Sequence, residues 1–253
     1  MRYLLLVCSD GTATAEQGAV MRDSVPAWVA ETEAVRLGGH ALAAPDAAAT
    51  VRVRGGETIV TDGPFADTKE HVGGFDVIDC ADLDEAIEVA AKHPVSWFHM
   101  LEVRPFAPAW PPADPPQPWT DPIVLDRPVP PGHERYAMLF CADGIPGTDA
   151  EEQAIDRDAR AWLQARRESG AMLFGNPLRP PETATTVRVR DGETIVSDGP
   201  FIETKEFIGG IDVVDCASRE EAIGLAAAHP LARFHMIEVR PFAADPRGDA
   251  DTI

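Results

Sequence analysis

The sequence has no long apolar run and none of the short motifs that mark several large enzyme classes. No apolar segment approaches the roughly 18–20 residues that a membrane-spanning helix needs, and the N-terminal apolar run is too short for a secretory signal. The chain also lacks a P-loop, a GxGxxG motif that opens a helix, and a GxSxG elbow. These absences predict a cytoplasmic protein without a membrane partner, and they give no reason to expect a cofactor.

Positive charge and cysteine are scarce. The chain holds 22 Lys and Arg residues against 42 Asp and Glu, for a formal net charge of −20. A field of that sign repels phosphate backbones, so we expect no nucleic-acid partner. None of the four cysteines belongs to a CxxC pair, and no other residue set has the spacing of metal ligands. We therefore predict no metal site and interpret the cysteines as small buried strand residues.

What the chain does contain is a long internal repeat. TIVTDGPFADTKEHVGGFDVIDC, residues 58–80, returns as TIVSDGPFIETKEFIGGIDVVDC, residues 194–216. The chain start, RYLLLVCSDG, returns as RYAMLFCADG. Repeats of this length predict two tandem domains, 1–107 and 135–243, because the repeats of a solenoid are far shorter.

Two segments lie outside the repeat. Residues 108–134 contain ten prolines, which favour extended polyproline geometry and predict a semi-rigid linker long enough to let the two domains meet. Residues 244–253 are small and acidic and predict a flexible tail.

The sequence pattern of each copy predicts secondary-structure elements in the order strand, helix, strand, hairpin, strand, helix, strand. Alternating apolar residues flank Asp191-Gly192 in one copy and Gly55-Gly56 in the other, which indicates a β-hairpin with a tight turn. Asp82 is a predicted N-cap of the second helix, which Pro94 ends. This order is that of the ferredoxin-like βαββαβ unit, an α+β fold, with a hairpin inserted.

A ferredoxin-like sheet has helices on one face only, so its other face needs a cover. The second copy supplies a second sheet, and we predict that the two sheets pack as an intrachain pseudo-dimeric α+β barrel. Further association between chains is left open. In the usual strand order Cys8 and Cys80 lie at opposite ends of the sheet, so no disulfide is expected within the domain. The paired glycines at 73–74 and 209–210 predict a bulge or a close backbone approach.

The segment VTDGPFADTKEHVGGFDVID, together with the EVRPF that closes each copy, resembles the DGPF, or YCII-related, family of dimeric α+β barrel proteins. The resemblance covers both copies nearly end to end and implies a fused pseudo-dimer. It implies little about function. Some relatives are proposed or shown to use a His–Asp pair in the barrel pocket for acid–base chemistry, and others are encoded beside extracytoplasmic-function sigma factors.

One departure from the family matters for the site. In the shorter relatives the proposed catalytic histidine lies on or just after the first helix. Here that helix carries Trp28 and Trp162 and no histidine, and His40 after it is matched by Asn176 in the second copy. The family's His–Asp pair is therefore not carried over onto these positions.

The repeated motif carries the first candidate site residues. Asp62 and Asp198 open the two DGPF turns, where an Asp can accept from the backbone of the turn or act as a base at a pocket mouth. Lys69 and Lys205 follow, each beside a Glu on a strand entry, so one side chain of each pair could face the interior and polarise a carbonyl or anion. A solvated charged edge is the other interpretation.

His99 and His235 in the last strands are the second candidates. Alternation puts His99 on one face with Leu101 and Val103. If that face meets the helices, His99 is a core or edge histidine; if it faces the cavity, it is a candidate general base. If His99 meets the helices, Glu102 and Arg104 face the cavity instead, together with Glu238 and Arg240 from the second copy.

Two functions follow from these candidates. The first is an acid–base enzyme, isomerase-, lyase- or hydrolase-like, acting on a small and perhaps carbonyl-bearing molecule held between the domains. The second is a non-catalytic small-ligand-binding or regulatory protein associated with an extracytoplasmic-function sigma factor system, which the absence of a known nucleophile or metal motif favours. In both, a small-molecule ligand is the expected partner.

Overall fold

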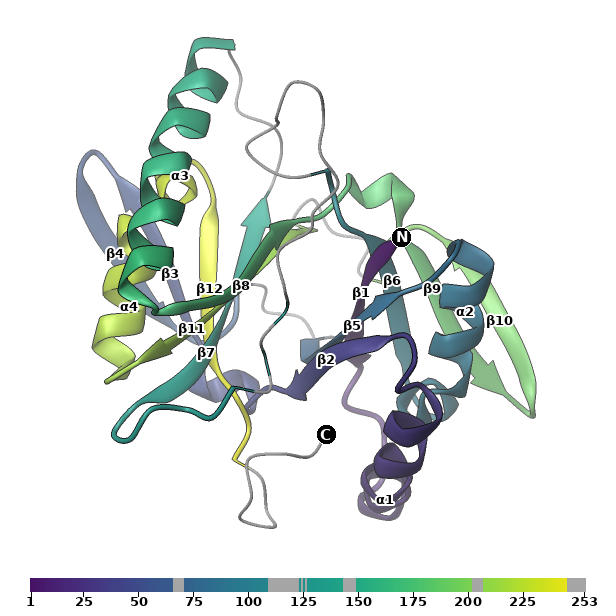
Figure 1. Cartoon of the computed structure of the whole chain (residues 1–253). Coiled ribbons are helices and arrows are strands. Elements are labelled where there is room, and N and C mark those ends of the chain that lie inside the picture. Colours follow the sequence, from purple (N-terminus) through teal and green to yellow (C-terminus); the bar gives the residue numbers. More distant parts are fainter. Residues whose placement is uncertain are drawn as a thin grey trace.

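The structure of the chain is a computed structural model that describes residues 1–65, 71–108, 123, 125, 127–142, 149–201 and 207–244. Most of the proline-rich linker and the acidic tail predicted at 244–253, except its first residue, lie outside the described residues. The two copies fold side by side as two sheets, each with its own pair of helices on the outer side (Figure 1).

The two copies have the same order of elements, which is the predicted order. The first contains β1 (Arg2–Ser9), α1 (Ala15–Glu31), β2 (Arg36–Ala41), β3 (Ala49–Arg54), β4 (Glu57–Asp62), β5 (His71–Asp79), α2 (Leu83–Lys92) and β6 (Met100–Pro105). The second contains β7 (Glu134–Ala142), α3 (Asp149–Ser169), β8 (Met172–Pro177), β9 (Thr185–Arg190), β10 (Glu193–Asp198), β11 (Phe207–Cys216), α4 (Arg219–Ala228) and β12 (Met236–Pro241). Short 3-10 helices η2 (Pro94–Trp97) and η4 (Pro230–Arg233) precede the last strands.

Local sequence explains where these elements begin and turn. The Thr14 side chain accepts from the Gln17 N–H, and the Gln17 side chain accepts from the Thr14 N–H, which satisfies two donors at the start of α1. The predicted cap at Asp82 is confirmed, since its carboxylate accepts from the Glu85 N–H at 3.0 Å. At the β9–β10 turn both Asp191 and Gly192 have positive φ, 53° and 79°, as a two-residue hairpin turn requires.

The core of each sheet has the ferredoxin-like strand order. The first sheet runs β10-β9-β6-β1-β5-β2 and the second β4-β3-β12-β7-β11-β8, all pairs being antiparallel. Cys8 lies opposite Val72 at one end of β1, whereas Cys80 bonds to Met1 at the other end. All four cysteines are free and buried, as predicted. The expected irregularity at the paired glycines is also present, since register shifts there in both copies.

The two hairpins are exchanged between the copies. The β3–β4 hairpin of the first copy pairs with β12 of the second, with Ile237 opposite Val51. The β9–β10 hairpin of the second copy pairs with β6 of the first, with Leu101 opposite Val187. In Figure 1 the β9–β10 hairpin stands beside β6, and β3–β4 stands beside β12 on the opposite side. Each six-stranded sheet therefore contains strands from both copies.

Side chains on the two faces of each sheet enter different cores. Tyr3 and Leu5 of β1 pack with Trp28 and α2 on the helix side, whereas Leu4 and Leu6 belong to a cluster shared with the other sheet. The shared cluster contains residues of β1, β5, β7 and β11, so each sheet covers the bare face of the other. Backbone bonds also join the sheets at their margins, Ala43 N–H to Pro241 O at 2.9 Å and Ala107 N–H to Pro177 O at 3.0 Å.

None of the described helices is long and apolar enough to cross a membrane. α1, α2 and α4 instead bury the residues that face the adjacent sheet, among them Trp28, Ala86 and Ala222.

The close approach of β2 to β5 makes Gly39 a test of the packing. A Cβ at Gly39 would lie 2.5 Å from the Phe75 carbonyl oxygen and would overlap the Asp76 carboxylate. We expect Gly39→Ala to lower the free energy of unfolding by about 1–3 kcal/mol, because a strand backbone has to move. Urea unfolding measures this. In the control, Gly224→Ala in α4, nothing lies within 4 Å of the new Cβ, and helix propensity should raise stability by about 0.5–1 kcal/mol. An equal, small effect of both changes would contradict the observed packing.

Candidate functional site

The two DGPF turns each reach across to the last strand of the other copy. Gly63 and Gly199, two residues before the Phe of each turn, adopt φ of +100° and +95°, which only glycine takes readily. The Phe65 N–H donates to Glu238 Oε2 at 3.0 Å. The Phe201 N–H donates to Glu102 Oε2 at 3.2 Å. The most distinctive motif of the sequence therefore makes a bond between the copies.

A buried arginine completes each of these contacts. Arg104 forms an ion pair with Glu102, and its Nη1 donates to the carbonyl oxygens of Arg179 at 3.3 Å and Ile208 at 3.2 Å. Both side chains of the pair are at most 2% exposed. The second copy repeats the arrangement with Glu238 and Arg240, whose Nη1 donates to Ala43 O and Val72 O. We call these two arrangements the Glu–Arg clamps.

The clamps settle which face of the last strand meets which core. Leu101 and Val103 lie in the helix-side cluster. Glu102 and Arg104 consequently lie on the opposite side, toward the second copy. His99 directly precedes β6 and is buried. By the same alternation it lies on the side that meets the helices, which is the arrangement of a core or edge histidine and not of a base that faces the cavity.

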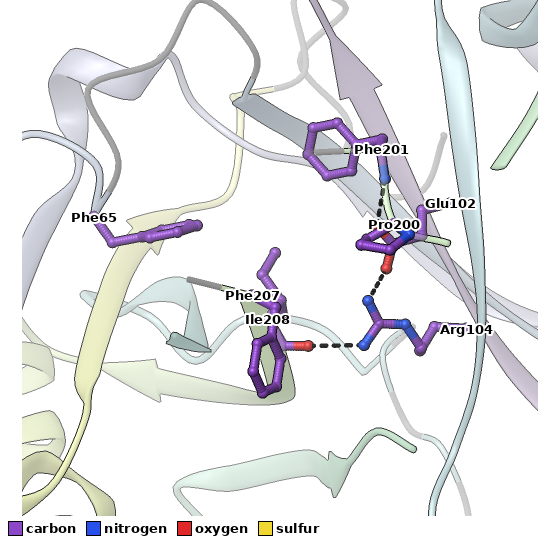
Figure 2. Close-up of a pocket in the computed structure, with 7 residues that line it drawn as sticks. All are labelled: Phe65, Glu102, Arg104, Pro200, Phe201, Phe207 and Ile208. Atoms are coloured by element: carbon purple, nitrogen blue, oxygen red, sulfur yellow. Dashed lines mark hydrogen bonds and ion pairs between the residues drawn. The ribbon is translucent and has the colours of Figure 1, made fainter. Parts of the chain in front are cut away.

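A small pocket lies beside the first clamp. Figure 2 shows Glu102 held between Arg104 and the Phe201 N–H, with aromatic rings on the other sides. Because both Glu102 oxygens accept from protein donors, its charge is already compensated. The pocket is aromatic, with a charged but internally satisfied wall; its lining residues are Phe65, Glu102, Arg104, Pro200, Phe201, Phe207 and Ile208.

The predicted DGPF aspartates lie on the surface at the ends of the hairpins. The Asp62 side chain is 87% exposed and pairs with Arg219 Nη2 at 2.8 Å. Asp198 is exposed at the end of β10. Neither lines the pocket of Figure 2. Lys69 and Lys205 lie outside the described residues, so the roles suggested for these four residues stay predictions.

His99 has a carboxylate partner that the sequence did not indicate. Its Nδ1 lies 3.1 Å from Asp10 Oδ1, and its side chain is 6% exposed whereas that of Asp10 is 28% exposed. A bond from the Thr12 hydroxyl, at 2.6 Å, lowers the pKa of Asp10, and His99 lowers it further. Asp10 follows β1 and His99 precedes β6, two paired strands, so they share one sheet end. That adjacency was the only signal available in the sequence.

The predicted counterpart, His235, is half-buried before β12. The residue that aligns with Asp10 is Asp143, which lies outside the described residues. A His–Asp pair is therefore described in the N-terminal copy.

Comparison with known proteins agrees with this geometry. The family model described as the YCII-related domain matches the chain twice, at residues 1–107 and 136–243. This protein belongs to the YCII-related family. An uncharacterized protein of Rhizobium meliloti (strain 1021) is 44% identical over 117 residues, which cover 42% of this chain and 93% of the relative. The relative is thus similar to about one copy of the repeat, and the resemblance identified from the DGPF and EVRPF segments is confirmed.

Two further histidines of this YCII-related protein serve as caps. His93 Nδ1 accepts from the Val95 N–H at 3.1 Å and His229 Nδ1 from the Leu231 N–H at 3.2 Å, at the starts of η2 and η4. Both rings are buried against a tryptophan of the first helix of their copy, with centroids 4.3 and 4.5 Å apart. These histidines anchor local structure in the helix-side cores.

The thiols of Cys80 and Cys216 in the YCII-related protein are poorly placed for chemistry. Burial raises the pKa of the Cys80 thiol to about 11 and that of Cys216 to about 12, which leaves little thiolate at neutral pH. Among the described residues, no three His, Cys, Asp or Glu side chains are grouped so that they could hold a metal ion. A second His–Asp contact, His93 Nε2 to Asp76 Oδ2 at 3.5 Å, has both side chains buried, whereas the His99–Asp10 pair includes a partly exposed carboxylate.

Proposed function

We propose that this YCII-related protein is an acid–base enzyme that acts on a small carbonyl-bearing molecule, with His99 as the group that transfers the proton. The observation that carries the proposal is the contact between His99 Nδ1 and Asp10 Oδ1 at 3.1 Å. The shared apolar cluster occupies the region between the sheets, so the proposal places the reaction at the sheet end where β1 and β6 meet. His99 is thus proposed as a base that faces Asp10 at this sheet end, and not as the cavity-facing base considered from the sequence.

Asp10 supports this role because it stays charged. Its lowered pKa keeps the carboxylate ionised at neutral pH, and an ionised carboxylate accepts the Nδ1 proton of a neutral imidazole. The lone pair of that imidazole is then on Nε2, which can take a proton from the substrate. The same carboxylate stabilises the imidazolium that forms.

The reaction class follows from this single group. A base on Nε2 can remove a proton from carbon next to a carbonyl and return it, which is the common step of isomerases and of many lyases. The Asp10 side chain is 28% exposed, so solvent reaches the carboxylate at this end of the sheet, while the His99 side chain is 6% exposed.

The test does not need the natural substrate. Wild-type protein in D₂O is incubated with pyruvate, phenylpyruvate, dihydroxyacetone and cyclohexanone, and deuterium incorporation is followed by proton NMR. We expect exchange above the buffer rate, and His99→Gln should reduce it by about 10²–10⁴-fold, the usual contribution of a general base. His133→Gln, at an exposed position, is the matched control and should keep the full rate. Undiminished exchange in His99→Gln, or no exchange of any compound, would overturn the proposal.

A non-catalytic ligand-binding or regulatory function is the second candidate, and the pocket of Figure 2 favours it. Its charged groups are engaged in the first Glu–Arg clamp and its other walls are largely aromatic, which suits binding better than proton transfer. Calorimetry with small aromatic molecules that bind without turnover, or co-purification with an extracytoplasmic-function sigma factor, would support it. Catalysed exchange that depends on His99 would count against it.

A further inference from the structure

The sheet end that holds His99 also holds Ser9 and His71. In the register of the first sheet, Cys8 of β1 lies opposite both Val72 of β5 and Met100 of β6. One residue further along, Ser9 lies opposite His71, and His99 directly precedes Met100. Two strand residues, Ser9 and His71, and the residue that precedes a third strand, His99, therefore lie at the same end of the sheet.

Ser9 and His71 share a face of the sheet, and His99 lies at the same sheet end. Cys8 and Val72 belong to the cluster between the sheets, and Met100 packs against it. Because successive strand residues alternate, Ser9 and His71 are directed to the other face. His99, which directly precedes β6, bonds to Asp10, the residue that follows Ser9. Neighbouring strands are about 4.8 Å apart, so the backbones at His71 and His99 are separated by roughly 10 Å with Ser9 between them. That separation suits a molecule of a few heavy atoms.

The C-terminal copy has apolar residues at two of these three positions. Phe207 of β11 lies opposite Ala142 of β7, in the register where His71 lies opposite Ser9. The Phe207 ring lies near the Ala142 methyl, since both are within 4 Å of the Cβ position of Gly209. Only the histidine before the last strand, His235, is kept. A phenyl ring and a methyl group can neither donate a hydrogen bond nor transfer a proton.

We infer that His71 and Ser9 complete the proposed site in the N-terminal copy, and that the chain has one reaction site, for a carbonyl compound with an acidic C–H, rather than two. The inference rests on the proposed function of His99. His99 takes the proton as the C–H bond breaks, and the electron pair moves to the carbonyl oxygen, which becomes an enolate. His71 and the Ser9 hydroxyl donate hydrogen bonds to that oxygen. His99 then returns the proton to carbon, so that no other reactant is consumed.

The duplication supplies the variants for the test. Ser9→Ala with His71→Phe gives the N-terminal copy the residues of the C-terminal copy, and Ala142→Ser with Phe207→His makes the reverse change. His71→Gln is a milder variant in case the double change perturbs folding, which urea unfolding checks. Two readouts are used: deuterium exchange into pyruvate, and NMR titration of the histidine side chains with oxamate, which resembles pyruvate but has no C–H to exchange.

We expect one oxamate per wild-type chain, with binding weakened at least tenfold and exchange reduced at least a hundredfold in Ser9→Ala/His71→Phe. Exchange that needs His99 but is unchanged in this variant and in His71→Gln would overturn the inference and leave the proposed function standing. Oxamate binding that needs His71, without any exchange, would overturn the proposed function and support the single site. Two oxamate molecules per wild-type chain would overturn the single site. Neither binding nor exchange would overturn both.

Discussion

Replacing Arg104 by methionine is expected to lower the free energy of unfolding by about 3–5 kcal/mol, because it leaves the Glu102 charge buried without its partner. Both side chains are at most 2% exposed, so water cannot take over the role of the guanidinium. The change also removes the donor to the carbonyl oxygens of Arg179 and Ile208, and buried acceptors without a donor add to the loss.

A second substitution in the Arg104→Met background separates the charge from the packing. Glu102→Gln in the Arg104→Met background removes the unpaired charge while an amide oxygen can still accept from the Phe201 N–H, so we expect part of the lost stability to return. Arg240→Met should resemble Arg104→Met, because the second clamp makes the same set of bonds. Arg52→Met, at an exposed strand position, should stay within about 0.5 kcal/mol of wild type. Urea unfolding measures all four, and a mild Arg104→Met effect with no recovery would refute the clamp.

Replacing His229 by glutamine is expected to change how stability depends on pH. Burial lowers the pKa of His229 to about 3, since the 4.0 Å separation between its Nε2 and Asp212 Oδ2 is too long for a hydrogen bond that would offset burial. The unfolded chain has an imidazole pKa of about 6.5. Between about pH 3 and pH 6.5 the imidazole of residue 229 is protonated in the unfolded chain and neutral in the folded chain. The stability that neutral His229 contributes is therefore complete above about pH 6.5 and falls as the pH decreases toward 3.

The expected size follows from the separation of the two values. Each pH unit below 6.5 costs about 1.4 kcal/mol, so wild type should lose about 2 kcal/mol at pH 5 through this group alone. His229→Gln cannot lose that contribution. Its deficit relative to wild type at pH 7, which comes from lost ring contacts with Phe140 and Trp162, should therefore be about 2 kcal/mol smaller at pH 5. Urea unfolding at both pH values tests this. Leu225→Ala, in the same core, is the control, with an equal deficit at both pH values, and an equal deficit for His229→Gln would be the contrary result.

The clamps give the DGPF and EVR segments a shared physical meaning. Each segment looks like an independent motif when one copy is considered alone. In the folded chain the turn of one copy supplies the Phe N–H, and the last strand of the other supplies the Glu and Arg that bind it. The motifs that identify the family therefore hold the two halves together, and the chemistry we propose lies elsewhere, at His99 and Asp10.

Much of the fold could be read from the sequence because it depends on neighbouring residues. The alternation of apolar side chains predicts the strands, the Asp-Gly pair predicts the hairpin with a tight turn, and Asp82 predicts a helix start. Each follows from contacts within a few residues, and each is confirmed. The repeat also predicted a second sheet as the cover for the bare face of the first, which the shared cluster provides.

The exchange of the hairpins was decided by the tertiary structure. The hairpin strands ATVRVR and TTVRVR are nearly identical, as are the last strands MLEVRP and MIEVRP. Pairing within a copy or between copies would therefore bury almost the same side chains, and local preference cannot choose between them. The path of the chain after β2 determines which last strand the hairpin pairs with, because the Ala43 N–H bonds to the Pro241 carbonyl oxygen of the other copy just before the hairpin begins.

The candidate site was likewise predictable from the sequence only in part. The sequence pointed to His99 by residue type and strand position. Its partner Asp10 is 89 residues away in the chain and meets it only because β1 and β6 are neighbours in the sheet. The sequence shows the type of each residue, and residue type determines what chemistry a side chain can do. Strand register and the joining of the two copies determine which side chains meet. Only the folded chain fixes these two.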